Sequence, residues 1–243
     1  MRIVLAILFM TCFCKAGSCN LHALTGLPTP ERATEQRVKD AITLPRNFFY
    51  HDSICYRIVS EEKRTCEVSN DGITDESGKP VNRLYKGKIE IPSHAVREGK
   101  RYTVIRVGDS AFDGCAVTEV HLPATVTDIG RKAFFGTRRL MRIDLPHRLS
   151  HIGQMAFAGS GLELLVLPAS VELIEAGAFA LCESLCTISC LAEEPPKMDA
   201  SVFHRQTPLH AVEFHVPYGS RHLYEKAEGW KSFTIIGTNS TRE

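Results

Sequence analysis

The sequence predicts a mainly β protein in which similar coils of chain stack into a solenoid, and three recurring features support this prediction. Short apolar segments recur at Val117–Pro123, Leu140–Pro146 and Leu162–Pro168, with a weaker copy at Leu185–Leu191. Phenylalanines recur at spacings of 22 to 24 residues, at Phe112, Phe134, Phe157, Phe179 and Phe203. An alanine precedes each of the first four, which indicates a small residue beside a ring that fills the core. A coil of about 22 residues cannot bury its apolar face alone, so successive coils must stack.

The apolar segments follow the pattern L-x-x-L-x-L, which at this period is typical of leucine-rich repeats. In the copy at Leu140–Pro146, Ile143 and Leu145 are two residues apart and therefore share one face of a strand. The closing proline lacks an N–H group and should end each strand. The sequence thus predicts a leucine-rich repeat solenoid of about four to five coils, with short helical or irregular turns between strands.

A glycine stands three residues before several of the alanine–phenylalanine pairs, at Gly108, Gly130 and Gly153. We expect these glycines to adopt a backbone conformation that other residues disfavour. The next copy has Glu175 at this position, which is a local departure from the repeat.

Residues 1–18 have the features of a signal peptide. Arg2 gives a positive start, and the uncharged apolar run Ile3–Cys14 is too short to span a bilayer. The small residues Ala16–Ser18 suit a signal peptidase, and cleavage after them would make Cys19 the first mature residue. The same bond also fits a lipoprotein cut that would leave a lipid on Cys19. Both interpretations predict an exported protein.

The rest of the chain divides into five further regions. These are a polar tether (residues 19–47), an N-terminal β-cap with the strand leading into the first coil (48–107), the repeats (108–210), a C-terminal cap (211–237) and a tail (238–243). Caps are expected because an open solenoid end would expose apolar core and strand edges. We expect cap strands at Ile54–Val59, Cys66–Val68, Leu84–Ile91 and Tyr102–Val107. The C-terminal cap should hold a strand and a short helix that Ser220 caps and Gly229 ends, with Trp230 covering the last coil.

Cysteines offer candidate disulfides. Cys55 and Cys66 lie on the two arms of one predicted hairpin, in a protein whose export would permit oxidation. A bridge from Cys182 to Cys186 or to Cys190 is a further candidate. Cys115 and Cys182 share one column of the repeat and Cys190 replaces an inward leucine, so packing is an alternative role for them. The chain has no C-x-x-C pair, which excludes zinc-ribbon and thioredoxin-like sites.

The composition and motifs argue against several classes of function. With 29 basic and 28 acidic residues, the chain has no electrostatic case for binding nucleic acid or an anionic membrane surface. The motifs of zinc proteases, serine hydrolases and phosphate-binding loops are absent, and no carboxylates pair as in glycosidases. His204, His210, His215 and His222 match no metal-ligand spacing. We therefore expect a protein that is not an enzyme, with no catalytic residues, metal or cofactor.

Some motifs go beyond the general repeat pattern. The repeats combine Leu-Pro, a following Ile-Gly, and Ala-Phe with Gly-Cys shortly after it, as in Ala111–Cys115. Near the C-terminus, Val216–Ser220 is followed by Tyr224, Trp230 and Phe233. This combination resembles the BspA-like (bacterial surface antigen) leucine-rich repeat family, over roughly residues 48–237. The resemblance implies an N-terminal β-cap, a C-terminal cap, and a place outside the cell or at the surface or outer membrane of a bacterium.

The predicted strands also suggest a binding face. The outward positions are Glu119, His121, Arg142, Asp144, Leu164, Val166, Thr187 and Ser189. Glu119 can pair with Arg142 and His121 with Asp144 across neighbouring strands, and such ladders could simply support stacking. Leu164 and Val166 are apolar where solvent is expected, which is typical of a contact site. The alternative is that a cap or an N-terminal segment covers them.

We therefore expect an exported module that binds another protein, and the resemblance implies a role in cell-surface adhesion or in recognition of a host protein. The expected partner is a host matrix protein, an envelope protein or a glycan. Contact with a membrane would come only through a lipid on Cys19. The alternative is a structural subunit of a bacterial envelope complex.

Overall fold

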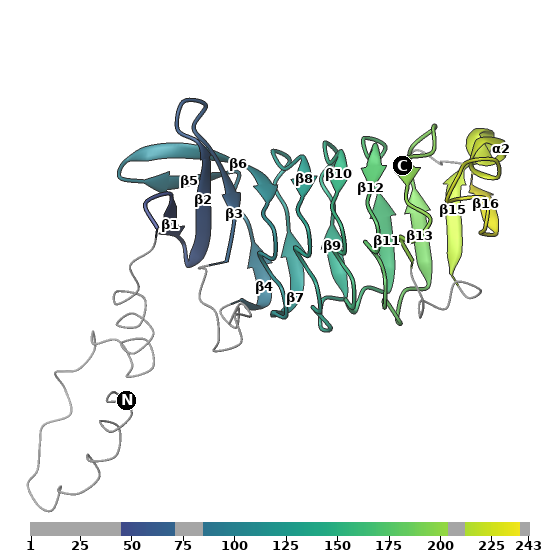
Figure 1. Cartoon of the computed structure of the whole chain (residues 1–243), viewed down its shortest axis with the longest axis horizontal. Coiled ribbons are helices and arrows are strands. Elements are labelled where there is room, and N and C mark those ends of the chain that lie inside the picture. The colour runs from purple at the N-terminus through teal and green to yellow at the C-terminus, as the bar shows by residue number, and fades with distance from the viewer. Residues whose placement is uncertain (1–44, 71–84, 204–211, 239–243) are drawn as a thin grey trace, which may run out of the picture. The chain divides into compact units, whose positions relative to one another are not determined.

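The repeat folds into a stack of coils that carries strands along two of its sides (Figure 1). The computed structural model describes residues 45–70, 85–203 and 212–238, and the structural statements below concern these residues. The predicted signal peptide, Cys19, nearly all of the tether, His204, His210 and the end of the tail lie outside them.

The first side is one continuous sheet of short parallel strands. It runs through β6 (Lys100–Val107), β8 (Asp128–Ile129), β10 (His151–Ile152), β12 (Leu173–Ile174) and β14 (Lys197–Met198). The N-terminal cap extends this sheet through β1 (Phe48–His51), β2 (Ile54–Ser60) and β3 (Thr65–Val68), while β5 (His94–Arg97) pairs with β6. β1, β5 and the two-residue strands β8, β10, β12 and β14 were not predicted from the sequence. We refer to this side as the short-strand face.

The second side carries the predicted L-x-x-L-x-L strands. One ladder joins β4 (Lys86–Glu90), β7 (Ala116–His121) and β9 (Arg142–Asp144). A second joins β11 (Leu164–Leu167), β13 (Thr187–Cys190), β15 (Glu213–Pro217) and β16 (Ile235–Thr238). β9 and β11 are neighbours but belong to separate ladders. We call the outward surface of β4, β7, β9, β11, β13 and β15 the strand face. Because β4 pairs with β7, the chain before residue 108 already contributes a strand to the solenoid.

The recurring phenylalanines form the centre of the core, as the sequence predicts. Phe112, Phe134, Phe157 and Phe179 are fully buried and lie one above another. Successive ring centroids are 5.0, 5.1 and 5.6 Å apart, and Phe203 continues the stack at 5.7 Å from Phe179. The rings stack face to face because each sits at the same point of its coil, with an alanine giving the next coil room to approach.

The repeat glycines are required for a different reason from the one expected. Gly130 and Gly153 do not have positive φ angles. A Cβ atom on Gly153 would lie 2.9 Å from the backbone N of Arg131 and 3.0 Å from the carbonyl oxygen of Ile129. Glycine is needed there because the backbones of adjacent coils nearly touch. Glu175 breaks this pattern and instead turns its carboxylate to the neighbouring coil, where Oε2 accepts a hydrogen bond from the backbone N of Gln154 at 2.8 Å.

Two other columns of the repeat hold the left-handed backbone. The first is Ser110, Lys132, Met155 and Gly177, with φ between 53° and 67°. The second is Gly114, Gly136, Gly159 and Leu181, with φ between 59° and 69°. Leu181 is therefore the only member of its column that has a side chain in a conformation costing L-residues about 1–2 kcal/mol.

The N-terminal cap closes the stack with antiparallel strands around a buried carboxylate. Glu67 on β3 is only 2% exposed. Its Oε1 accepts a hydrogen bond from Nε of Arg57 at 2.7 Å, and its Oε2 one from Nη1 of Arg106 at 3.1 Å. Arg106 lies on β6 and also binds Asp109, at 2.7 Å. This network joins the cap to the first coil.

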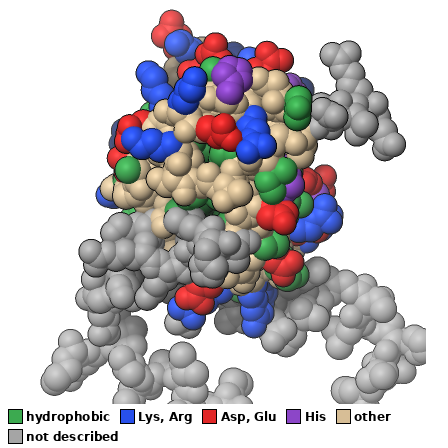
Figure 2. Space-filling view, turned by 90° about the vertical axis from the view of Figure 1, so that its right-hand side faces the viewer, with side chains coloured by type: hydrophobic (Ala, Val, Ile, Leu, Met, Phe, Trp, Pro, Cys, Tyr) green, Lys and Arg blue, Asp and Glu red, His purple; other side chains and the backbone are tan. Residues whose placement is uncertain are grey.

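The C-terminal cap closes the other end with aromatic side chains. After β15 come the short 3₁₀ helix η2 (Tyr218–Ser220) and helix α2 (Arg221–Tyr224), and β16 then extends the ladder. Trp230 is buried and its Nε1 donates a hydrogen bond to the carbonyl oxygen of Pro196 at 2.9 Å, so it covers the last coil as predicted. The hydroxyl of Ser220 makes no capping hydrogen bond, contrary to expectation. Seen from this end, charged side chains of both signs separate small apolar areas, as a cap requires (Figure 2).

The register of the N-terminal strands separates the first candidate cysteine pair. Cys66 lies opposite Ile58, three residues along β2 from Cys55, which corresponds to about 10 Å. The Cα atoms of a disulfide are at most about 7 Å apart. The structure therefore does not bring Cys55 and Cys66 together. Burial raises the pKa of the Cys66 thiol to about 12, so this thiol stays protonated near neutral pH.

Bridges from Cys182 to Cys186 or Cys190 are also not formed. The three cysteines are free thiols, and each has its own hydrogen-bond partner. Cys182 donates to the carbonyl oxygen of Phe157 and Cys186 to that of Glu163, both at 3.2 Å, and Cys190 accepts from the Tyr224 hydroxyl at 3.2 Å. Cys182 and Cys190 are buried, which agrees with a packing role, and burial raises the pKa of both thiols.

Candidate protein-interaction face

The strand face presents two rows of outward side chains, because inward and outward residues alternate along each strand. On β7, buried Val120 separates outward Glu119 and His121, and on β11 buried Leu165 separates outward Leu164 and Val166. Within each ladder the strand register places equivalent residues side by side. The structure thus brings the eight predicted positions onto one surface: Glu119, His121, Arg142, Asp144, Leu164, Val166, Thr187 and Ser189.

The structure adds two pairs to this face that the sequence interpretation missed. Lys88 and Glu90 extend it on β4, and Glu213 and His215 extend it on β15. The sequence holds a signal for both, since each pair flanks one apolar residue, as Glu119 and His121 do. The signal is weak because these two strands lie outside the run of regular repeats.

The charged end of the face is connected by ion pairs, although not all of them are the expected ones. His121 Nδ1 lies 3.5 Å from Asp144 Oδ2, as predicted. Glu119 is in register with Arg142 but contacts Lys88 at 3.7 Å and His121 Nε2 at 2.9 Å. The His121 contact lacks the geometry of a hydrogen bond and is attractive only when the imidazole is protonated. Arg142 has no ion-pair partner within the described part of the chain, and it is exposed to solvent.

The centre of the face is apolar. The side chains of Leu164 and Val166 are 50% and 42% exposed, and Leu191, at the position where other coils have proline, is 54% exposed. These three residues line a hollow of ≈ 390 Å³ between β9 and β11, which Arg142 and His147 also border. Exposed apolar side chains with charged groups around them are typical of sites where another molecule binds.

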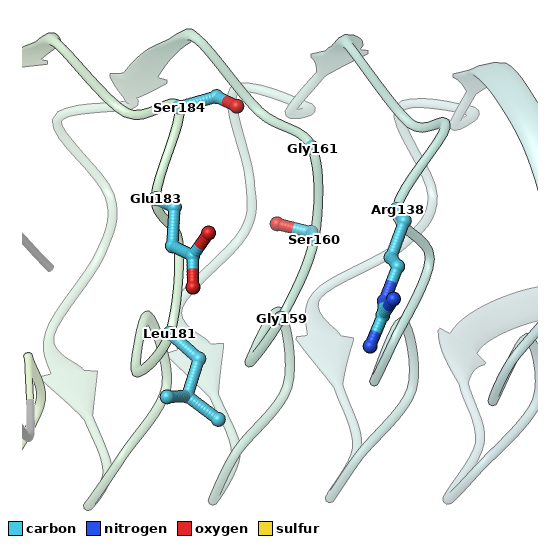
Figure 3. Close-up of a pocket in the computed structure, with 7 residues that line it drawn as sticks. All are labelled: Arg138, Gly159, Ser160, Gly161, Leu181, Glu183 and Ser184. Atoms are coloured by element: carbon cyan, nitrogen blue, oxygen red, sulfur yellow. The ribbon is translucent and has the colours of Figure 1, made fainter. Parts of the chain in front are cut away.

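A second hollow lies where the third coil is recessed (Figure 3). One residue separates Ser160 from the first strand leucine, whereas two separate the equivalent residues Thr137 and Cys182 from theirs in the coils on either side. The recess of ≈ 410 Å³ has Gly159–Gly161 as its floor, with Arg138 and Glu183 on opposite sides. Its two charged side chains have opposite signs, and Leu181 and Ser184 complete the lining.

The short-strand face differs from the strand face. His151 lies between Asp128 and Glu175, at 3.7 Å and 3.1 Å. Leu173 on β12 is 39% exposed and lines a further hollow beside Pro195 and Pro196. Within the described ranges no His, Cys, Asp and Glu side chains gather in a group of three that could hold a metal. In the same ranges no helix has the length and apolar character needed to cross a membrane.

Comparison with known proteins identifies the repeat. Residues 105–225 match the model for the BspA type leucine rich repeat region in six copies. A leucine-rich repeat protein from Bacteroides capillosus is 26% identical, with a TM-score of 0.49 over 60% of this chain and 99% of that one. The pneumococcal vaccine antigen PcpA is 20% identical, with a TM-score of 0.52 over 74% of this chain and 52% of that one.

A leucine rich cell surface protein from Faecalibacterium prausnitzii is 20% identical, with a TM-score of 0.44 over 80% of this chain and 51% of that one. A search of the curated proteins finds no match. The repeat period, the stacked phenylalanines and the matched repeat model agree with one another. Residues 105–225 therefore belong to the BspA-type leucine-rich repeat family, and the protein is a mostly β solenoid of about five turns.

Proposed function

We propose that this protein is an exported, non-enzymatic module that binds another protein through its strand face. The apolar centre of that face carries the proposal. Leu164 and Val166 on β11 and Leu191 just after β13 remain about half exposed, although burying the exposed half of each would gain about 1 kcal/mol. A protein partner would supply that burial, and Arg142, Asp144 and His147 around the hollow would select a partner of matching charge.

The proposed biological role is adhesion at the cell surface or recognition of a host protein. The repeat family and the likeness to a vaccine antigen and a cell surface protein are the support for that role, together with the predicted signal peptide at residues 1–18. We propose export with cleavage before Cys19, which leaves either a free or a lipid-bearing Cys19. The mass of the mature N-terminus distinguishes these two forms, and labelling of intact cells tests exposure.

The binding test uses two leucines that differ in face but not in chemistry. The purified protein is measured by biolayer interferometry against immobilised host matrix proteins. We expect Leu164→Asp to weaken binding at least about tenfold, since it places a charge in the contact. Leu173→Asp makes the same change on the short-strand face, where the exposed fraction is 39% instead of 50%, and should leave binding unchanged. Equal binding by both variants would exclude the strand face.

A role as a structural subunit of an envelope complex is the alternative. It uses the same face, and it predicts that the protein purifies from cell envelopes with a constant set of partners and does not bind matrix proteins. Loss of those envelope partners in Leu164→Asp, with retention in Leu173→Asp, would support this alternative.

A further inference from the structure

The two rows of the strand face complement each other in charge and polarity on every strand. The two outward residues of each strand are Lys88 and Glu90, Glu119 and His121, Arg142 and Asp144, Leu164 and Val166, Thr187 and Ser189, and Glu213 and His215. Each charged pair has one acidic and one basic residue, with histidine counted as basic when it is protonated. The two central pairs are apolar with apolar and hydroxyl with hydroxyl.

This pattern is what a surface needs in order to bind a second copy of itself. A twofold axis that runs along the stack, midway between the rows, places the first row of one copy opposite the second row of the other. Arg142 then faces the partner subunit's Asp144, and Leu164 faces the partner subunit's Val166. The rule holds on β4, β9, β11 and β13 whatever the state of the histidines, and on β7 and β15 when His121 and His215 are protonated.

A twofold axis along the strands would not place complementary residues opposite each other on every strand. It would reverse the order of the coils and keep each row opposite itself. Centred midway between β9 and β11, it would place Arg142 opposite the partner subunit's Leu164 and Asp144 opposite the partner subunit's Val166, which buries charges against apolar side chains.

Centred on β11, it would place like charges opposite each other. Glu119 would then face the partner subunit's Glu213, and His121 would face the partner subunit's His215. Like charges placed opposite each other are unfavourable, so the arrangement of charges selects the axis along the stack.

We propose that the strand face joins two copies of this chain into an antiparallel, face-to-face dimer. Six strands about 4.8 Å apart and three to six residues long give a footprint of about 400 Å² per copy, before side-chain relief is added. Stable dimers usually bury about 800 Å² per partner, so this dimer lies at the weak end of the range. Leu164 and Val166 form its centre, and the charged pairs surround them.

The inference rests on the proposed function only in using the same face for protein contact. The dimer hides the hollow at Leu191, so a different protein partner must compete with the second copy. Self-association then regulates how much of the strand face is available at a given protein concentration.

Charge reversal tests the pairing directly. Arg142→Asp leaves two acidic residues on β9, and Asp144→Arg leaves two basic ones. Sedimentation velocity on the purified protein should show dimers for the wild type and at least about tenfold weaker self-association for each variant. An equimolar mixture of the two variants should restore dimers, because the acidic β9 of one then faces the basic β9 of the other. The double variant R142D/D144R should also recover self-association.

The control is Lys197→Asp, a charge reversal on exposed β14 of the short-strand face, which should dimerise like the wild type. A wild type that stays monomeric up to roughly 100 μM overturns the proposal. So does a mixture that fails to restore dimers, or single variants that dimerise normally. If the wild type is monomeric while Leu164→Asp still loses matrix-protein binding, the dimer is rejected and the proposed function stands. If the wild type forms dimers but binds no matrix protein, the dimer stands and the proposed matrix-protein binding is rejected.

Discussion

The two ends of the solenoid are closed by caps of different chemistry. Both must cover a column of stacked rings that the repeat would otherwise leave open. The N-terminal cap uses antiparallel strands and a buried carboxylate, Glu67, held by Arg57 and Arg106. The C-terminal cap continues the parallel ladder and packs aromatic rings, with Trp230 T-shaped to Phe214 and Tyr224 at 6.3 and 5.0 Å. The difference shows that a cap must fit the coil next to it, and that the repeat does not determine which side chains the cap uses.

The largest effect should come from removing the ring that closes the C-terminal end. Trp230→Ala deletes a fully buried side chain and should lower the free energy of unfolding by about 3–5 kcal/mol, measured by urea denaturation. Trp230→Phe keeps a ring but loses the hydrogen bond to Pro196. We expect it to lower the free energy of unfolding by more than about 1 kcal/mol, but by less than Trp230→Ala does. Similar, small losses in both variants would show that the aromatic cluster does not hold this end.

The N-terminal end should respond to charge rather than to size. Glu67→Gln keeps the shape of the side chain but removes the carboxylate that Arg57 and Arg106 share, and Arg106 then keeps only its contact with Asp109. We expect a loss of about 3 kcal/mol, at the lower end of the range for a broken buried pair, because Arg57 and Arg106 are 43% and 31% exposed and can reach water. Glu62→Gln, at an exposed position of the same cap, is the matched control and should be neutral. If Glu67→Gln left the free energy of unfolding unchanged, the buried carboxylate would not be what stabilises the N-terminal cap.

A smaller, stabilising effect should sharpen the contrast. Leu181 occupies a left-handed position, with φ of 59°, where the equivalent residues are Gly114, Gly136 and Gly159. Leu181→Gly removes that strain and should raise the free energy of unfolding by about 1 kcal/mol. Thermal unfolding provides the measurement. Gly159→Leu, the reverse change in the neighbouring coil, should be destabilising, and a gain there would contradict the explanation.

The sequence predicted the interior of this protein better than its ends. A period near 22 was enough to place Phe112 above Phe134 and to assign Leu165 inward and Leu164 outward, because each coil repeats the same packing problem. β1 and β5 were missed because the cap occurs once in the chain and has no second copy to compare with it. The position of Glu67 was missed for the same reason.

The repeat glycines show a second limit of the sequence. Periodicity revealed that Gly130 and Gly153 are special, but a close approach between coils and a left-handed φ leave the same trace in a sequence. The left-handed positions at Ser110, Lys132 and Met155 carried no signal, since none of these residues is glycine. For the strand face, the sequence supplied the residues, while the contacts of Glu119 depended on side-chain geometry that the pattern does not contain.

The column of phenylalanines also has a direction. Adjacent rings tilt by 2°, 4°, 10° and then 26° from Phe112 to Phe203, after which Phe214 and Phe233 meet Phe203 edge-on at 90° and 81°. A duplicated coil inserted near Phe134 would find flat platforms above and below it, whereas one added after Phe203 would meet a ring turned on its side. Internal duplication of a coil should therefore be tolerated near the N-terminal end of the stack and not after Phe203.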